Sequence, residues 1–161
     1  MPDLASKIID REKGYVHHPK DRGGPTKYGI TRQTLSSWLG REATAADVAK
    51  LDKTTASNII NAEYAAPFSF IRPGRLKDLL VDAAVQHGPV DAIRWLQRAA
   101  GVTPDGRVGP QTIAAVGAQG EDSLYDSVLT DRLAKYAALS QTPRGRAFAK
   151  GWENRMAEFL R

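Results

Sequence analysis

The feature that most constrains the fold is a helix-breaking stretch at residues 15–31, YVHHPKDRGGPTKYGIT, in a chain otherwise patterned for helices. Its two prolines and three glycines exclude a continuous helix and demand turns. Tyr28 and Ile30 fit a short strand within it. The sequence therefore predicts one irregular β-hairpin at residues 15–31, and no other segment is a convincing β candidate.

Helical periodicity covers the chain on both sides of this hairpin. The first helix is expected over residues 3–13, with Leu4, Ile8 and Ile9 as its apolar stripe. The most regular pattern lies at residues 75–87, where apolar side chains recur with amphipathic helical spacing. Further helices are expected from Thr31 to Gly40, over residues 54–65, after Pro89, at Pro110, and over residues 122–140 and 144–160. The predicted fold class is mainly α, with one small hairpin lobe near the N-terminus.

Size and composition are those of one globular domain. The chain has 161 residues, of which 42% are hydrophobic and 25% charged. No apolar run approaches the roughly 18 to 20 residues that span a bilayer. Cysteine is absent, so no disulfide framework is expected.

The net charge of +5 favours polyanionic partners, namely nucleic acid, anionic lipid or acidic cell-wall polymers. A moderately basic protein without such a partner is the alternative. The first ten residues, MPDLASKIID, contain no apolar segment of the kind found in secretory signals, so none is expected.

Two carboxylates stand in contrasting settings. Glu12 continues the first apolar stripe and lies near a helix C-terminus, so partial burial and the helix dipole both favour its protonated form. Asp21, nine residues later, lies among turn residues between Lys20 and Arg22, where we expect it to stay ionised. A protonated and an ionised carboxyl are the working pair of a glycosidase. The spacing alone is a weak signal and favours the alternative, a solvated acid at Glu12 and a turn-forming aspartate at Asp21.

Glu12 to Thr31, with the pattern E-K-G-Y-V-x-x-P-x-D-x-G-G-x-T-x-x-G-I-T, resembles the signature of glycoside hydrolase family 108. These proteins are N-acetylmuramidases, many of them phage endolysins. The order Glu, Asp, Thr also resembles the catalytic triad of T-even phage lysozymes, where the spacing from Asp to Thr is one residue longer. Four later segments resemble the peptidoglycan-binding segment of the family: DAAVQHG at 82–88, AIRWLQRAA at 92–100, PDGRVGPQT at 104–112 and FAKGWENRM at 148–156.

The resemblance implies a single lysozyme-like domain, with a catalytic segment at 1–92 and a peptidoglycan-binding helical segment at 93–161. It also implies hydrolysis of the β-1,4 bond between N-acetylmuramic acid and N-acetylglucosamine. Glu12 would protonate the leaving oxygen, while Asp21 and Thr26 would position a water molecule. This inverting course needs roughly 6.5 to 9.5 Å between the carboxyls, and a retaining course with Asp21 as nucleophile stays open. No metal or cofactor is required.

Further expectations concern the ligands and the location of the enzyme. Substrate contacts are expected from Tyr15, Tyr28, Gln86 and His87, although relatives commonly carry Asn in place of Gln86. The protein is expected to be a monomer that binds peptidoglycan strands and not nucleic acid, with weak contact to anionic membranes through its basic C-terminal helix. It is expected to be made in the host bacterial cytoplasm without a signal peptide and to reach the periplasm after release by a hole-forming protein.

Three other functions are compatible with parts of the chain. Residues 31–63 could be read as a helix-turn-helix, but residues 54–64 hold almost no Arg or Lys to meet phosphates. A non-catalytic wall-binding module would explain the charge and the C-terminal half, but not the set of Glu12, Asp21 and Thr26. A lytic transglycosylase would cleave the same bond without water, and Asp21 argues against it because one acid suffices there.

Overall fold

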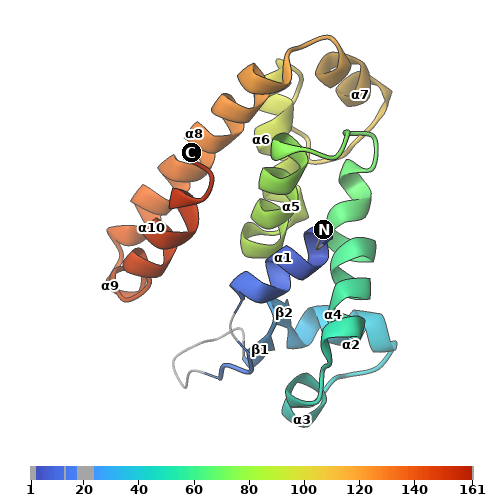
Figure 1. Ribbon diagram of the computed structural model, residues 1–161, viewed down its shortest axis with the longest axis vertical. Helices are drawn as coiled ribbons and strands as arrows, with labels where there is room; N and C mark the ends of the chain where they lie inside the picture. The colour runs from blue at the N-terminus through green and yellow to red at the C-terminus, as the bar shows by residue number, and fades with distance from the viewer. Residues whose placement is uncertain (1–2, 13, 18–23, 161) are drawn as a thin grey trace. The chain divides into compact units, whose positions relative to one another are not determined.

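A computed structural model describes residues 3–12, 14–17 and 24–160 (Figure 1). The described chain is predominantly helical, with one small antiparallel sheet near the N-terminus, which confirms the predicted fold class. It divides into two compact units, residues 1–66 and residues 67–161. The boundary after residue 92 that the resemblance implies lies within α6 (Pro89–Ala100), and it stays a prediction. No described helix combines the length and the apolar composition needed to cross a membrane.

The helices of the first unit begin at polar caps. They are α1 (Leu4–Arg11), α2 (Arg32–Leu39), α3 (Ala45–Ala49) and α4 (Lys53–Ile59). Their N-caps are Asp3, Thr31, Thr44 and Asp52, and each side chain accepts a backbone N–H of the first turn. Thr44 and Asp47 form a capping box, and α2 ends at Gly40, in the left-handed region.

The helix expected over residues 54–65 changes its winding along its length. It consists of α4 followed by a π-helix, η1 (Ile60–Ala65), and then by a short 3-10 turn, η2 (Ala66–Phe68). Its apolar residues Ile59, Ile60 and Tyr64 are buried as the periodicity predicts. A π-turn inserts one extra residue per turn, which a pattern of apolar positions does not reveal.

The sheet is smaller than the hairpin that the sequence predicts. Strands β1 (Thr26–Lys27) and β2 (Ile30–Thr31) pair antiparallel around Tyr28 and Gly29, which have φ of 53° and 79°. Two positive φ values are the geometry of a tight hairpin turn with the twist of its strands. The expectation that Tyr28 lies on a strand was therefore wrong, because this residue forms the turn. The first half of the predicted hairpin contributes one bridge, from Val16 to Thr26, and residues 18–23 lie outside the described part.

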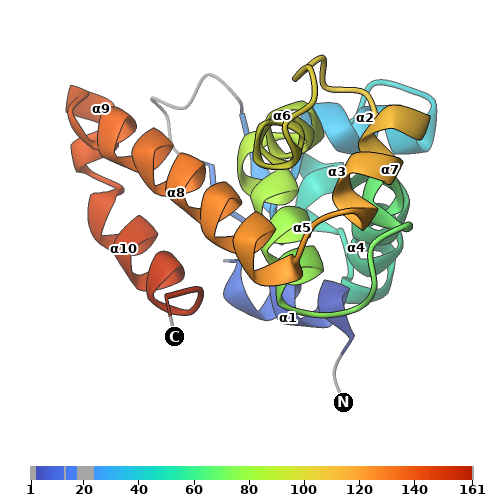
Figure 2. The same cartoon turned by 90° about the horizontal axis from the view of Figure 1, so that it is seen from above.

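The second unit is a helical bundle. It contains α5 (Arg75–His87), α6, α7 (Pro110–Gly117), α8 (Glu121–Ser140), α9 (Pro143–Arg146) and α10 (Ala149–Ala157). Helices α5, α6 and α8 pack against one another, and α10 packs on α8 (Figure 2). Fully buried core side chains of this unit include Leu76, Leu79, Leu80, Leu96, Leu124 and Val128.

The single helix predicted over residues 144–160 is two helices. At Phe148 the backbone departs from helical geometry, with φ of −105° and ψ of −8°, and its N–H donates to Gly145 one residue closer than in an α-helix. The chain then resumes as α10. Phe148 is left 47% exposed and stacks on Trp152 at 6.2 Å between ring centroids.

Three charged side chains form a buried cluster in this bundle, the Asp82 cluster. Asp82 is fully buried and accepts from Arg132 Nη2 at 2.7 Å and from Arg155 Nε and Nη2 at 2.9 and 2.7 Å. Burial alone would raise the pKa of Asp82, but the two guanidinium groups outweigh it and the pKa lies below its usual range. The cluster ties α10 to α5 across 73 residues of sequence.

Residues 101–109 form the loop between α6 and α7. Gln97, 1% exposed, donates to Asp105 Oδ1 and Arg107 O and accepts from Gly106 N. Gly106 has φ of +79°, and a Cβ there would lie 2.9 Å from Val90. This explains the glycine of the DGRVG segment as a requirement of the loop.

Candidate functional site

Glu12 stands at the end of α1. The helix ends at Arg11, and Glu12 is its C-cap, with φ of −79° and ψ of 144° in the extended region. Its N–H donates to Ile8 O at 3.0 Å, which is the last hydrogen bond of the helical pattern, and the backbone leaves the helix at Glu12 itself. The side chain is half-buried. The expectation of a partly buried acid at a helix C-terminus is confirmed.

Thr26 is placed beside the segment that follows Glu12. Val16 and Thr26 exchange two backbone hydrogen bonds of 2.8 Å each, and Thr26 pairs on its other side with Thr31. Antiparallel partners of this kind lie about 5.5 Å apart at Cα, and Val16 is four residues after Glu12. A chain of four residues spans at most about 14 Å. The bridge therefore brings Thr26 into the neighbourhood of the chain segment that carries Glu12.

Asp21 lies outside the described residues. In the sequence it is the central position of residues 17–25, the segment between the two bridged residues Val16 and Thr26. Its assignment as the second carboxylate stays a prediction.

The two candidate tyrosines of the first unit occupy different positions. Tyr15 is 42% exposed on the segment between α1 and the bridge. Tyr28 occupies the tight turn of the hairpin, with the ammonium of Lys27 5.2 Å from its ring centroid. Lys27 itself donates to Ala49 O at 2.7 Å, which ties the hairpin to α3. Both rings belong to the same unit as Glu12 and Thr26, and a role in sugar binding stays a prediction for each.

Gln86 and His87, the other candidate substrate contacts, form the last turn of α5 in the second unit. The His87 ring packs edge-on against Trp95 and Tyr136, with centroids 5.2 and 4.9 Å apart, and its Nε2 accepts from Arg132 Nε at 3.4 Å. Gln86 is half-buried. His87 is thus part of the packing around the Asp82 cluster, and contact with substrate stays a prediction.

His87 is held in its neutral form. Burial is the main cause, and the charges of Arg132 and Lys135 add to it, against the opposing effect of Asp91 and Asp82, so that the pKa falls from 6.5 to about 3. Between these two pH values the unfolded chain binds a proton that the folded chain does not. The free energy of unfolding therefore increases as the pH rises from about 3 to 6.5, and it decreases again as the pH falls through this range.

We expect acidification from pH 7 to pH 5 to lower the free energy of unfolding by up to about 2 kcal/mol through His87. In His87→Gln this loss should be absent, because glutamine does not titrate. Urea denaturation at the two pH values checks it. Equal losses in the two proteins would contradict the assignment, and His17→Gln, an exposed histidine of the first unit, serves as the matched control.

Within residues 3–12, 14–17 and 24–160, no group of three or more His, Asp or Glu side chains is arranged to hold a metal ion.

Comparison with known proteins agrees with the resemblance read from the sequence. Residues 5–88 match the family model described as Glycosyl hydrolase 108, and residues 91–157 match one described as Predicted Peptidoglycan domain. The first match includes Glu12, Asp21 and Thr26. A solved structure of SagA from Brucella abortus is 35% identical, covers 95% of this chain and 87% of its own, and superposes with a TM-score of 0.82. No curated protein matches the chain.

Proposed function

Because the chain belongs to the glycosyl hydrolase 108 family and carries a peptidoglycan domain, it is a peptidoglycan glycosidase, and we propose that it is a muramidase of the lysozyme type. The bond cleaved would be the β-1,4 link between N-acetylmuramic acid and N-acetylglucosamine. The observation that carries the proposal is the placement of Glu12 at the end of α1, close along the chain to the Val16–Thr26 bridge.

In the proposed reaction Glu12 is the general acid. Its carboxyl donates a proton to the glycosidic oxygen as the bond to the anomeric carbon breaks. A half-buried carboxyl held at the C-cap of α1 suits this role, because its position is fixed by the helix that precedes it.

Asp21, assisted by Thr26, is proposed to act on the opposite face of the sugar. The carboxylate would take a proton from a water molecule, and the resulting hydroxide would bond to the anomeric carbon with inversion. A hydroxyl such as that of Thr26 can both donate to and accept from that water. The hydrogen bonds on both sides of Thr26 support this part of the proposal, because they hold its backbone rigidly in place.

Mass analysis of digested peptidoglycan tests the reaction. Reducing N-acetylmuramic acid ends are expected. Anhydro ends would mean a lytic transglycosylase, and binding to sacculi without new glycan ends would mean a non-catalytic wall-binding protein. Either result would overturn the proposal.

Contact with anionic membranes through the C-terminal segment is a second, subordinate proposal. Arg144, Arg146 and Lys150 flank Phe148, the exposed aromatic residue between α9 and α10. Cationic side chains around an exposed aromatic ring suit an anionic lipid surface. Co-sedimentation with phosphatidylglycerol vesicles, and its absence with phosphatidylcholine vesicles, would support the contact.

Release from the cytoplasm by a separate hole-forming protein is likewise proposed, and lysis of a culture only when such a protein is co-expressed would support it.

A further inference from the structure

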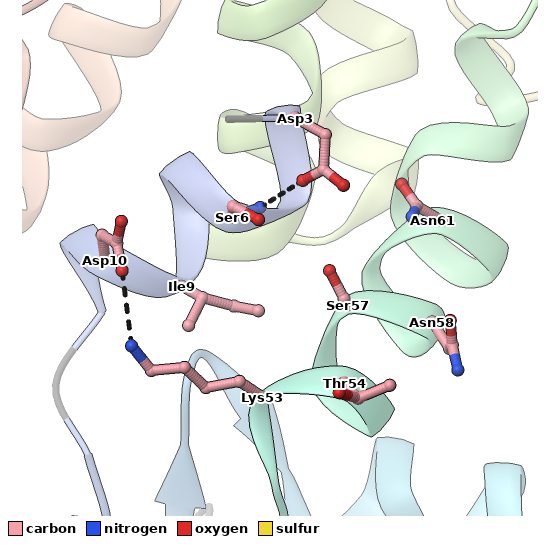
Figure 3. Close-up of a pocket in the computed structure, with 9 residues that line it drawn as sticks. All are labelled: Asp3, Ser6, Ile9, Asp10, Lys53, Thr54, Ser57, Asn58 and Asn61. Carbon is pink, nitrogen blue, oxygen red and sulfur yellow. Dashed lines mark hydrogen bonds and ion pairs between the residues drawn. The ribbon is translucent and has the colours of Figure 1, made fainter. Parts of the chain in front are cut away.

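A polar groove runs between α1 and the α4–η1 helix, within the first unit (Figure 3). Its volume is about 500 Å³, which falls in the range of small-molecule sites. Among the described residues that line it, Ile9 alone is apolar, and the others are polar: Asp3, Ser6, Asp10, Lys53, Thr54, Ser57, Asn58 and Asn61. We call this cavity the α1–α4 groove.

The groove is made by two polar stripes at helical spacing. Ser6 and Asp10 lie on one face of α1, below its N-cap Asp3, and Thr54, Ser57, Asn58 and Asn61 line the groove from the α4–η1 helix (Figure 3). Ser, Thr and Asn are poor helix formers, and solvated helix faces usually carry charged residues with higher helix propensity. A face built from hydroxyl and carboxamide side chains sacrifices local stability, which is typical of functional surfaces.

The backbone beside the groove is also unusual. Asn61 lies on η1, the π-helix that follows α4. Such π-turns are rare and occur frequently at functional sites, where they redirect side chains. This observation is independent of the side-chain chemistry and points to the same wall of the groove.

The charges of the groove indicate what kind of ligand it suits. Asp10 pairs with Lys53 at 3.5 Å, so these two charges largely cancel. Asp3 Oδ1 accepts from Ser6 N at 2.7 Å, and its carboxylate leaves the lining with one net negative charge, from two aspartates and one lysine. An anionic ligand is therefore disfavoured. Hydroxyl and carboxamide groups, each able to donate and accept, match a neutral ligand rich in hydroxyls and amides.

The groove is separate from the catalytic acid. Glu12 is not among its lining residues. Asp10, which lines it, lies within α1, whereas Glu12 follows the last helical residue, Arg11, and has an extended backbone. A ligand in the groove would therefore not occupy the site at which Glu12 acts.

We propose that the α1–α4 groove is an accessory binding site for a neutral N-acetylated saccharide unit of a glycan strand. The inference rests on the proposed function, which supplies the glycan. Such a site would hold the catalytic unit on the insoluble polymer by contacts outside the reacting bond.

The test is an amide NMR titration of the Glu12→Gln protein, which should not cleave its ligand, with a peptide-free tetramer of N-acetylglucosamine. Saturable shifts are expected at the amides of Ser6, Ser57 and Asn61. The double variant Asn58→Ala/Asn61→Ala should bind the tetramer about tenfold more weakly at these amides, the factor expected for two ordinary hydrogen bonds. Alanine favours the helix, so loss of folding is not a concern for this variant.

Glu63→Ala, an exposed residue of η1 outside the lining, is the matched control and should bind as the parent does. No shift at the groove amides, shifts unaffected by the double variant, or shifts caused by a free stem peptide instead of the sugar would overturn the inference. The two proposals fail separately. If Glu12→Gln loses lytic activity but no ligand binds in the groove, only the accessory site is contradicted. If the groove binds the tetramer but the parent protein produces no new glycan ends, only the muramidase reaction is contradicted.

Discussion

Replacing Glu12 by Gln is expected to lower the turnover of purified sacculi by about 10²–10⁴-fold, the usual contribution of a general acid. Glutamine keeps the size of the side chain and can still donate hydrogen bonds, but it cannot transfer a proton to the glycosidic oxygen. The cap should survive, because the bond to Ile8 O comes from the backbone N–H. Clearing of a sacculus suspension measures the loss, and thermal unfolding followed by circular dichroism shows whether the fold is intact.

Glu42→Gln is the matched control, since Glu42 is an exposed glutamate of the same unit. It should clear sacculi at the parental rate. The Glu12→Gln protein should still co-sediment with sacculi, because the peptidoglycan domain at residues 91–157 is unchanged. Full lytic activity in Glu12→Gln would show that another group donates the proton.

Replacing Asp82 by Leu is expected to lower the free energy of unfolding by about 3–5 kcal/mol, the cost of leaving a buried charge without its partner. The side chains of Asp82 and Arg132 are both fully buried, so Arg132 cannot recover hydration when the carboxylate is removed. Arg132 Nη1, moreover, has no hydrogen-bond partner among the described residues, which leaves that guanidinium poorly satisfied even with Asp82 in place. Urea denaturation at pH 7 measures the loss.

Two further variants separate a buried charge from an ordinary ion pair. Asp91→Asn breaks a pair of the same 2.7 Å length to Lys135, but these side chains are 32% and 38% exposed, so the cost should stay below about 1 kcal/mol. Adding Arg132→Met to Asp82→Leu should restore part of the stability, because the more deeply buried of the two arginine charges is then removed. If Asp82→Leu cost no more than Asp91→Asn, the cluster would not hold the bundle together as inferred.

The sequence contains an indication that Asp82 is buried, in addition to the helical periodicity. The residue stands within the apolar pattern of α5, between Leu80 and Ala83, where a charge requires a partner. Which residues supply that partner could not be inferred, since Arg132 and Arg155 are 50 and 73 positions away in a chain with many arginines. The polar stripe at residues 54–61 can likewise be recognised in the sequence, because it consists of residues that form helices poorly. It becomes a groove only because the polar stripe of α1 faces it.

The hairpin shows where local reasoning fails. Turn residues correctly predicted that the described residues 15–17 and 24–31 are not helical, yet Tyr28 was placed on a strand. Strand propensity favours tyrosine, but the two-residue turn of a hairpin this short requires positive φ at Tyr28 as well as at Gly29. The register of the pairing, which settles this, is a property of two segments together.

The amino-acid sequence by itself determined most of the helices and the position of Glu12 at the end of the first helix. These features depend on side chains within about four positions of one another, which is the range of helical periodicity and capping. Only the tertiary structure decided that Thr26 bridges to Val16, that Asp82 meets two arginines, and that two polar faces enclose a groove. Each of these contacts joins segments that are distant in sequence. An amphipathic pattern indicates whether a helix face is buried or solvated, but not which other element packs against that face.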